Sequence, residues 1–536
     1  MTLPHLRKQG NKTVLIVEDQ PYIALAGEVH NSDSSSITYM EGIWKIADEL
    51  HMNTLLLPVT WEMVEPIEDQ FDFSNPKALI DQARNHHKKI IFLWFGSWKN
   101  AEMMYTPEWV KKDREHFKRG QIVKGQDKTN RKLSATMDYG FPYYTISYLC
   151  EEAKKADAKA FARFMDFLKD YDETENTVIM VQVENETGLL GAAREVSDRA
   201  DEAFNEQVPE EFLSYLRQHT ETMVPEIRDA VLNSTDSGTW KEVFKDAAEE
   251  LFSAYHVASY VETVAQTGKE VYPLPLSVNC WLDKGDEPGT YPSGGPISKV
   301  HEVWNYCAPS IDLDTPDIYV PDVNEICEEY TRRGTPLMIP ECATHSYCAP
   351  RLVYTIGHYH ALGYSPFGFD DIGKPFSAIQ GYLFGMDVTD PNLKTPQNFE
   401  EYAKTNELLG MLLPMIGNKL GSSDLQASNG ETTAFSQLYF DNIVITTAFQ
   451  SPIQSRTDGY CLVIKEKDEC FILGNVCSLL LNSVDQTKPN LDILCLEEGV
   501  FDEDYNWIPG RRLNGDEAAM LSFKEPSIWR LKYHVY

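Results

Sequence analysis

The residues best suited to chemistry in this chain are two glutamates, each placed at the end of an apolar run. Glu186, preceded by Asn185, follows the β-branched run 177–183, and Glu341 follows the run 336–340. Both runs are typical of buried strands in a parallel sheet. A carboxylate or an amide at the end of such a strand costs free energy unless it has a partner or a task. Two carboxyl groups placed in this way predict hydrolysis of a glycosidic bond, in which one protonates the leaving oxygen and the other supports the cationic centre.

Either glutamate alone would more simply be a salt-bridged carboxylate at the start of a loop. The two together, one of them preceded by Asn185, favour catalysis. Their function then depends on a fold that brings two distant strand ends to one pocket.

The elements around these strands predict such a fold. Apolar residues recur at helical spacing in 37–50, 76–87 and 152–170. Strand candidates with polar C-terminal ends are 22–28, 54–61, 89–98, 177–186, 274–281, 310–319, 335–341 and 365–370. Eight strands alternating with helices predict a (β/α)8 TIM barrel, whose active site lies at the C-terminal ends of its strands. Glu186 and Glu341 would end the fourth and seventh strands.

The chain divides into two predicted domains. Residues 1–395 would form the catalytic barrel, with insertions near 105–148 and 189–253 that wall the pocket. Residues 396–536 begin with a long helix over 398–416 and continue as short β-rich segments separated by turn residues. This pattern predicts a C-terminal antiparallel β domain, a sandwich or jelly roll. It could bind carbohydrate, mediate homo-oligomerisation or cover one face of the barrel, and the last two together are favoured.

The composition and the net charge restrict the kinds of molecule that the chain is expected to bind. The chain has 536 residues and a formal net charge of -34, with 42% hydrophobic residues. This charge argues against nucleic acid and anionic membrane, which both need clustered Lys and Arg. A neutral oligosaccharide or glycoside fits better. The ten cysteines show no metal-binding spacing, and neither a P-loop nor a dinucleotide-binding motif is present. With no apolar leader, we expect a cytoplasmic enzyme with reduced thiols and without metal or cofactor.

Several motifs together resemble family 35 of the glycoside hydrolases, mostly β-galactosidases of the clan of retaining (β/α)8 glycosidases. Residues 183–188, VENETG, resemble the acid/base motif I/V-E-N-E-x-G of that family. Four further stretches agree: 61–66 with 70–73, WEMVEP and QFDF; 96–102, GSWKNAE; 107–110, PEWV; and 27–30, GEVH. The resemblance covers roughly residues 14–372.

The resemblance implies a role for each matching residue. Glu186 would be the general acid/base and Glu341 the nucleophile, while Asn185 would bind the sugar 2-OH. Asn100, Ala101 through its backbone, and Glu102 would hold the outer hydroxyls. Tyr319, near the end of the sixth strand, would donate to Glu341 and keep it ionised; the alternative is an aromatic with its hydroxyl in water. Trp98 and Trp281 are the preferred stacking platforms for sugar rings.

The chain also departs from the family pattern. Pro58 replaces a Tyr that contacts sugar, Asn31-Ser32-Asp33 replaces a basic residue, and Cys342 begins a segment that is Trp-rich in the family. The implied activity is a retaining exo-β-glycosidase, β-galactosidase above all. Alternatives of the same mechanism are β-glucosidase, α-L-arabinosidase and β-xylosidase, and a transglycosidase would share every residue named. A catalytically silent carbohydrate-binding barrel is the alternative from another class.

Overall fold

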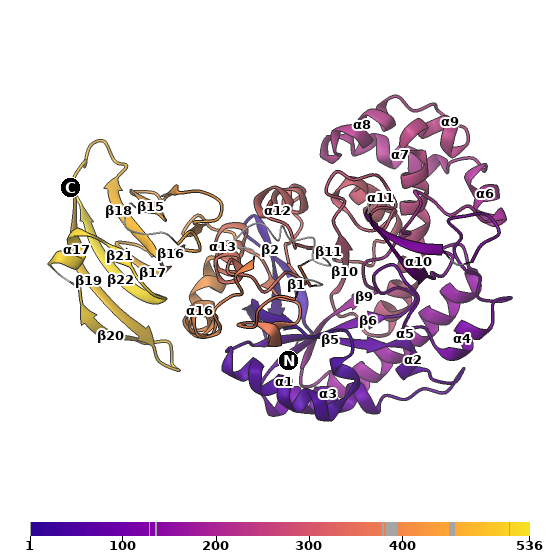
Figure 1. Ribbon diagram of the computed structural model, residues 1–536. Helices are drawn as coiled ribbons and strands as arrows, with labels where there is room; N and C mark the ends of the chain where they lie inside the picture. The colour runs from indigo at the N-terminus through magenta and orange to yellow at the C-terminus, as the bar shows by residue number, and fades with distance from the viewer. Residues whose placement is uncertain are drawn as a thin grey trace.

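The computed structural model describes residues 2–127, 129–134, 137–377, 380–381, 394–449, 456–513 and 515–536, with the backbone alone for 129–134 and 137–143. Figure 1 shows the N-terminal elements gathered around one central sheet and the C-terminal strands, in yellow, at the opposite end of the molecule. Helices α13 (Cys348–Tyr354) and α16 (Phe399–Lys419) lie between the two parts.

The centre of the larger part is a parallel sheet of order β11-β10-β9-β6-β5-β4-β12. Its strands are β4 (Ala24–Glu28), β5 (Thr54–Thr60), β6 (Lys89–Phe95), β9 (Val178–Val183), β10 (Leu276–Trp281), β11 (Leu313–Asp317) and β12 (Gly363–Tyr364). Residues 337–342 close the ring, because Ile318 N donates to Glu341 O at 2.9 Å and Ile339 N donates to Gly363 O at 3.1 Å. The predicted TIM barrel is confirmed.

Two strand predictions need correction in detail. The seventh segment pairs only through isolated bridges, Ile318 with Cys342 and Ile339 with Tyr364. Pro336 and Pro340 explain this, since proline has no N–H to donate to a ladder. The eighth strand is Gly363–Tyr364 and not 365–370; the end of that range, Phe369–Asp371, is a short 3-10 helix.

Helices with one apolar face cover the outside of the barrel. They include α1 (Ile37–Glu49), α3 (Ser74–Asn85), α5 (Glu151–Asp172), α10 (Ala248–Val271), α11 (His301–Cys307) and α12 (Val323–Thr331). In α1 the buried residues Met40, Ile43, Trp44 and Ala47 recur at helical spacing, and the Ser36 side chain caps the N-terminus. The predicted insertions contain α4 (Glu108–Lys112), the hairpin β7 (Thr129–Ser134) and β8 (Met137–Tyr143), and α6 (Asp198–Phe204), α7 (Glu210–Gln218), α8 (Pro225–Leu232) and α9 (Trp240–Phe244).

A small sheet that the sequence did not predict closes the N-terminal end of the barrel. It consists of β1 (His5–Gln9), β2 (Lys12–Val17) and β3 (Gln20–Tyr22). Leu15 and Val17 of β2 join the same buried cluster as Ala24, Ala26 and Phe95 of the barrel strands. Because this end is plugged by apolar side chains, polar groups inside the barrel gather at the opposite, C-terminal end.

The C-terminal part is a two-sheet sandwich that follows α16, a helix capped by Asn398 at its N-terminus. One sheet has the order β13-β16-β17-β22-β19-β20 and the other β14-β15-β18-β21. Their strands are β13 (Leu425–Asn429), β14 (Phe435–Tyr439), β15 (Ile443–Ala448), β16 (Tyr460–Glu466), β17 (Glu469–Asn475), β18 (Cys477–Ser483), β19 (Leu491–Phe501), β20 (Trp507–Arg512), β21 (Ser522–Phe523) and β22 (Ser527–Val535). The predicted antiparallel β domain is confirmed.

In the larger sheet of the sandwich, β16 and β17 are buried on both faces. Along β16, Cys461 and Val463 belong to the core between the two sheets, whereas Leu462 and Ile464 belong to the core shared with the barrel. The period of two along a strand explains why neighbours on β16 reach different cores. The division of domains at residues 395 and 396 stays a proposal.

Among the described residues, no helix combines the length and the apolar character needed to cross a bilayer.

Candidate active site

The two predicted catalytic glutamates lie together at the C-terminal end of the barrel. Glu186 follows β9, and Glu341 lies on the closing segment 337–342. Glu186 is 5% exposed and Glu341 4% exposed. One carboxyl oxygen of each, and one of Asp317 at the end of β11, lie within 4.8 Å of one another. Glu186 and Glu341, which are 155 positions apart in the chain, therefore share one small polar site, as the predicted barrel requires.

Glu341 is surrounded by hydrogen-bond donors. Tyr319 donates its hydroxyl to Oε2 at 2.7 Å, and the Nδ2 atoms of Asn185 and Asn279 each donate to Oε1 at 3.2 Å. Donors to both oxygens stabilise the carboxylate form, which is the form a nucleophile needs. Of the three donors, the sequence motifs pointed to Tyr319 and Asn185.

Glu186 is held from a different side. Asn100 donates Nδ2 to Glu186 Oε2 at 2.6 Å, and the backbone N of Glu186 donates to Asn279 Oδ1 at 3.0 Å. Asn100 and Ala101 form a tight turn between Lys99 and Glu102, whose backbone groups exchange hydrogen bonds of 2.8 and 3.0 Å. In this structure Asn100 contacts the predicted acid/base directly.

The backbone near the pair adopts an uncommon conformation. Asn100 (φ 53°), Ala101 (φ 60°), Glu184 (φ 63°) and Glu186 (φ 45°) all lie in the left-handed region although none is glycine. Residues other than glycine rarely adopt this conformation, and such strain concentrates at functional sites. The two left-handed residues of the turn match the type I′ geometry. They aim the Asn100 side chain at Glu186.

The structure adds four polar residues that the sequence did not single out: Glu28 at the end of β4, Lys99, Asn279 on β10 and Asp317. Asn279 Nδ2 also donates to Asp317 Oδ2 at 2.8 Å. Burial, followed by the charge of Glu341, raises the pKa of Glu28 and that of Asp317 well above their usual values. One sequence signal could have identified such residues, namely a polar residue within or at the end of an apolar strand. Glu186 is itself an example of that signal.

A second carboxyl pair lies beneath the site. Glu184 and Asp157 of α5 are both fully buried, and Glu184 Oε2 accepts from Trp98 N at 2.8 Å. Asp157 accepts from Trp94 Nε1 at 2.9 Å, Ser97 N at 3.0 Å and Ser97 Oγ at 2.6 Å. Burial and the neighbouring Asp157 raise the pKa of Glu184 well above its usual value. Burial also raises the pKa of Asp157, but its three donors favour the charged form, so we assign the proton of the pair to Glu184.

The remaining predicted sugar contacts differ in exposure. Glu102 and Trp281, the last residue of β10, are half-buried, whereas Ala101 is buried. Trp98 is only 1% exposed: its Nε1 donates to Thr145 Oγ1 at 3.1 Å, and its ring packs edge to face on Tyr260 at 4.6 Å. A sugar platform needs an exposed ring face, so Trp98 does not enter our proposal as a stacking residue.

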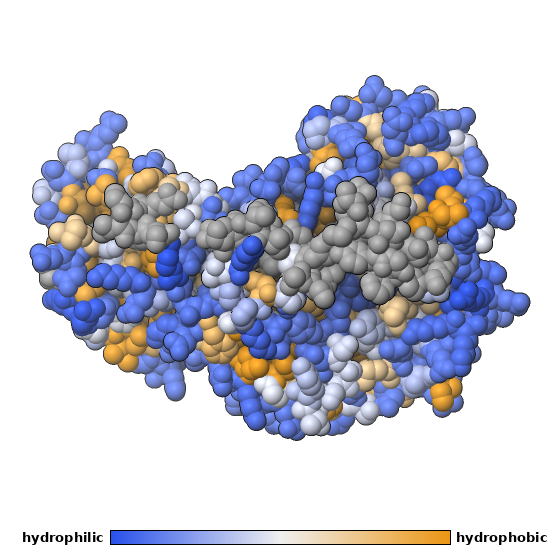
Figure 2. Space-filling view, in the orientation of Figure 1, coloured by the Kyte–Doolittle hydropathy of each residue, from blue (hydrophilic) through white to orange (hydrophobic). Residues whose placement is uncertain are grey.

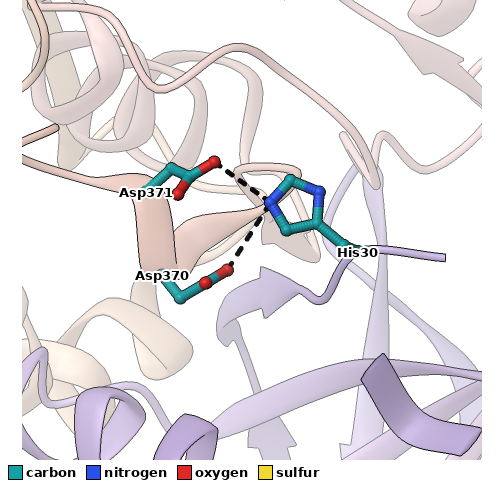
Figure 3. Close-up of side chains that lie close together, drawn as sticks. All are labelled: His30, Asp370 and Asp371. Atoms are coloured by element: carbon teal, nitrogen blue, oxygen red, sulfur yellow. Dashed lines mark hydrogen bonds and ion pairs between the residues drawn. The ribbon is translucent and has the colours of Figure 1, made fainter. Parts of the chain in front are cut away.

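A histidine and two aspartates connect the first and eighth strand ends at the barrel mouth. Figure 3 shows both carboxylates pointing at the His30 ring, with Asp371 Oδ2 3.1 Å and Asp370 Oδ1 3.8 Å from Nε2. Lys374 also pairs with Asp371, at 3.0 Å. The His30 ring packs edge to face on Phe367 at 5.3 Å. This cluster holds the loop after β12 against the loop after β4.

A cavity beyond the ends of β10 and β11 is lined by residues other than the pair. It measures about 910 Å³, and Leu282 and Val320 of its lining each follow a predicted sugar contact, Trp281 and Tyr319. Ten acidic residues and two lysines line the cavity: Glu226, Asp246, Glu249, Glu250, Asp283, Asp286, Glu287, Asp322, Glu325, Glu329, Lys284 and Lys299. Figure 2 shows that the visible face of the molecule is also mainly hydrophilic. A group that enters this cavity meets a negative field.

Comparisons by sequence cover only the C-terminal part. Residues 402–524, which include most of α16 and the sandwich up to β21, match a family model described as a domain of unknown function, DUF5597. No curated protein is similar enough to the chain to count as a match.

Solved structures similar to this chain include three glycosidases. A β-galactosidase from Bacillus circulans sp. alkalophilus is 14% identical to this chain, with a TM-score of 0.47. The match covers 74% of this chain and 57% of the β-galactosidase. A β-galactosidase from the psychrophilic Marinomonas ef1 is 12% identical (TM-score 0.46; 74% and 61%). An exo-β-1,4-mannosidase from Opitutaceae bacterium strain TAV5 is 13% identical (TM-score 0.41; 76% and 62%). The chain thus matches about three fifths of the length of these proteins.

Proposed function

We propose that the protein is a retaining exo-β-glycosidase that removes terminal β-galactosyl residues by double displacement. The observation that carries this proposal is the spacing of Glu186 and Glu341, whose nearest carboxyl oxygens lie within 4.8 Å. Retaining glycosidases hold their carboxyl groups about 5–5.5 Å apart, and inverting ones about 6.5–9.5 Å apart to admit a water. Carboxyl oxygens within 4.8 Å of each other leave less room for a water between the groups and support direct attack by one carboxylate.

The hydrogen bonds assign the roles. Glu341, with Tyr319, Asn185 and Asn279 as donors, attacks the anomeric carbon, and the bond to the leaving oxygen breaks as Glu186 protonates that oxygen. Glu186, now a carboxylate, then takes a proton from the water that displaces Glu341 from the glycosyl intermediate. Asn100 stays bonded to Glu186 and keeps it aligned in both steps. Asn185 lies beside Glu341, where its amide can also meet the sugar 2-OH.

The choice of galactose as the sugar rests on the motif resemblance. Trp281 and Glu102 keep exposed surface near the pair and are proposed to contact the outer part of the sugar. Pro58 stands where the family has a sugar-contacting Tyr. Its carbonyl oxygen accepts a hydrogen bond from the Ser34 hydroxyl at 2.7 Å. Small changes in hydroxyl contacts decide the sugar, so β-glucosides, β-xylosides and α-L-arabinosides belong in the test.

The test is a panel of nitrophenyl glycosides with these four sugars. We expect the largest kcat/KM with the β-galactoside and retention of configuration in the first product. Release of nitrophenol from none of them would contradict the enzyme and favour a binding protein. Product analysis at high acceptor concentration separates hydrolysis from transglycosylation.

Two variants separate the two roles. Glu341→Ala should lose turnover and regain it with azide, giving an α-glycosyl azide, because azide enters from the vacated nucleophile side. Glu186→Ala should keep fast glycosylation only with activated aryl leaving groups, which need no proton. If both variants turned over like the wild type, the assignment would be wrong.

A further inference from the structure

We propose that Lys99 is a positioning residue that fixes the negative charge of the active site on Glu341 and sets the orientation of the Asn185 amide. This inference rests on the proposed function and adds a residue that no motif assigned. Lys99 does not replace any donor of Glu341 named above; it acts through the electrostatics of the site and through Asn185.

Lys99 is placed where a lysine is costly. Its side chain is 4% exposed, and Nζ lies 2.9 Å from Asn185 Oδ1 and 3.9 Å from Glu341 Oε1. The same Nζ lies 5.2 Å from the centre of the Phe95 ring, which belongs to the apolar interior of the barrel, and 5.9 Å from that of Phe367. A buried ammonium is tolerated only where charges and hydrogen bonds compensate its desolvation.

Four acidic residues at the ends of different barrel strands supply the compensating charges. Burial lowers its pKa, but Glu341, Glu186, Glu28 and Asp317 together raise it above the ordinary value, so Lys99 remains an ammonium. A retaining mechanism needs one of these carboxyl groups ionised and another protonated at the same time. Four clustered carboxyl groups without a cation would share protons among themselves.

The position of the cation decides which carboxyl group is charged. Glu28 and Asp317 are driven towards their neutral forms by burial. Both oxygens of Glu28 lack a hydrogen-bond partner among the described residues, which suits a neutral group better than a carboxylate. Of the catalytic pair, Glu341 forms an ion pair with Lys99, whereas Glu186 accepts from the neutral Asn100 amide. The charge therefore settles on Glu341 and leaves Glu186 to carry the proton.

The second effect of Lys99 is on the Asn185 amide. An ammonium can only donate, so its partner on Asn185 must be the carbonyl oxygen, Oδ1. The amide nitrogen is then directed at Glu341 Oε1, 3.2 Å away. The backbone N of Asn100 also donates to Oδ1, at 3.4 Å, so removal of Lys99 leaves the amide oxygen with this longer bond. Lys99 thus makes the shorter of the two bonds that orient the residue proposed to bind the 2-OH.

The alternative is that Lys99 only supports the fold. Substitutions distinguish the two. Lys99→Met keeps the stem and removes the charge, Lys99→Gln keeps a donor for Asn185 without the charge, and Lys99→Arg keeps the charge. Lys88→Met is the matched control, since Lys88 is also buried, with an 8% exposed side chain, but pairs with Asp48 and with Met52 O far from the carboxyl pair.

The experiment is the pH profile of kcat/KM for the best nitrophenyl glycoside, with thermal unfolding measured for each variant. We expect the acid limb of Lys99→Met and Lys99→Gln to move to higher pH by about 1 to 3 units, because an opposite charge about 4 Å away has been removed. Lys99→Met should also lose about 100-fold or more in kcat/KM at neutral pH. Lys99→Arg and Lys88→Met should keep the acid limb of the wild type.

Each outcome is decisive. If folded Lys99→Met and Lys99→Gln lost activity but kept the wild-type acid limb, Lys99 would be structural and the inference would be overturned. An equal shift in Lys88→Met would also overturn it, because buried lysines in general would then be responsible. If the wild type hydrolysed none of the glycosides, the proposed function itself would fail first.

Discussion

At the scale of single residues, Asn279 contacts three other residues of the site. Its Nδ2 donates to Asp317 and Glu341, and its Oδ1 accepts from the backbone N of Glu186. Asn279→Ala removes three hydrogen bonds to the proposed nucleophile, its neighbour and the acid/base. We expect kcat to fall about 100- to 1,000-fold, the usual effect of removing a preorganised donor, with a smaller change in KM. Steady-state kinetics on the preferred nitrophenyl glycoside measure this.

Asn279→Asp is the control for shape. It keeps the size of the side chain but places a carboxyl group between Asp317 and Glu341, so we expect it to be at least as impaired as Asn279→Ala. Near-normal kcat in both variants would mean that Asn279 does not hold the catalytic pair.

At the scale of elements, the Asp157–Glu184 pair links α5 to the loop that carries Glu186. Because burial raises the pKa of Glu184, the folded protein holds this proton more tightly than the unfolded chain, in which the pKa is near 4.5. Unfolding therefore releases a proton above pH 4.5, and stability falls as pH rises towards the raised value. For one proton the slope is about 1.4 kcal/mol per pH unit.

We predict that Glu184→Gln reduces this loss of stability, because glutamine donates to Asp157 without titrating. Urea unfolding between pH 5 and pH 8 should show a flatter decline for the variant than for the wild type. Asp157→Asn, in contrast, weakens the acceptor for Trp94 and Ser97 and should be destabilised at every pH. Parallel curves for Glu184→Gln and the wild type would show that the pair shares no proton.

At the scale of the whole molecule, one buried ion pair connects the barrel to the sandwich. Arg351 of α13, 1% exposed, bonds both carboxylate oxygens of Glu431, at 2.9 and 2.6 Å. Arg351 Nη2 also donates to Val320 O at 3.1 Å, next in sequence to Tyr319. We predict that Arg351→Met destabilises the protein by about 3–5 kcal/mol, because it leaves the Glu431 charge without a partner.

The double variant Arg351→Met/Glu431→Leu tests the cause. Replacing both partners by apolar groups removes the unpaired charge, so most of the lost stability should return. Denaturant unfolding of the full chain measures both variants. A double variant as unstable as Arg351→Met would locate the effect in packing instead of charge.

The charge of the whole molecule also has a consequence for substrates. The cavity beside Trp281 and Tyr319 has ten acidic residues against two lysines, and the chain has a net charge of -34. An anionic aglycone, such as a carboxyphenyl group, should therefore show a KM several-fold higher than a neutral or cationic analogue at low salt. The difference should shrink at 0.5 M salt, where screening acts over about 4 Å. Equal KM values at low salt would contradict this.

Much of this organisation follows from local patterns in the chain. Apolar runs that end in polar residues predicted the barrel, and Asn185-Glu186 and Glu341 were predicted as its chemistry because buried strands rarely end in such groups without a reason. The segment that contains Pro336 and Pro340 is predicted as a regular strand, but it pairs only through isolated bridges. Proline has no N–H to donate to a ladder. The sequence did not predict the plug formed by β1, β2 and β3, because a short apolar run such as that of β2 does not by itself show which sheet it joins.

The partners around the pair are brought together only when the chain folds. Lys99, Asn279, Asp317 and Glu28 come from different strand ends, and each alone is an ordinary polar residue near a loop. Their roles depend on distances of a few ångströms across the barrel mouth, which no spacing along the chain encodes. The proposed acid and nucleophile could be predicted from the chain alone, because the ability of a carboxyl group to play either role is a property of side-chain chemistry. Which carboxyl group is charged is a property of electrostatics, and electrostatics depends on where the folded chain places its cation.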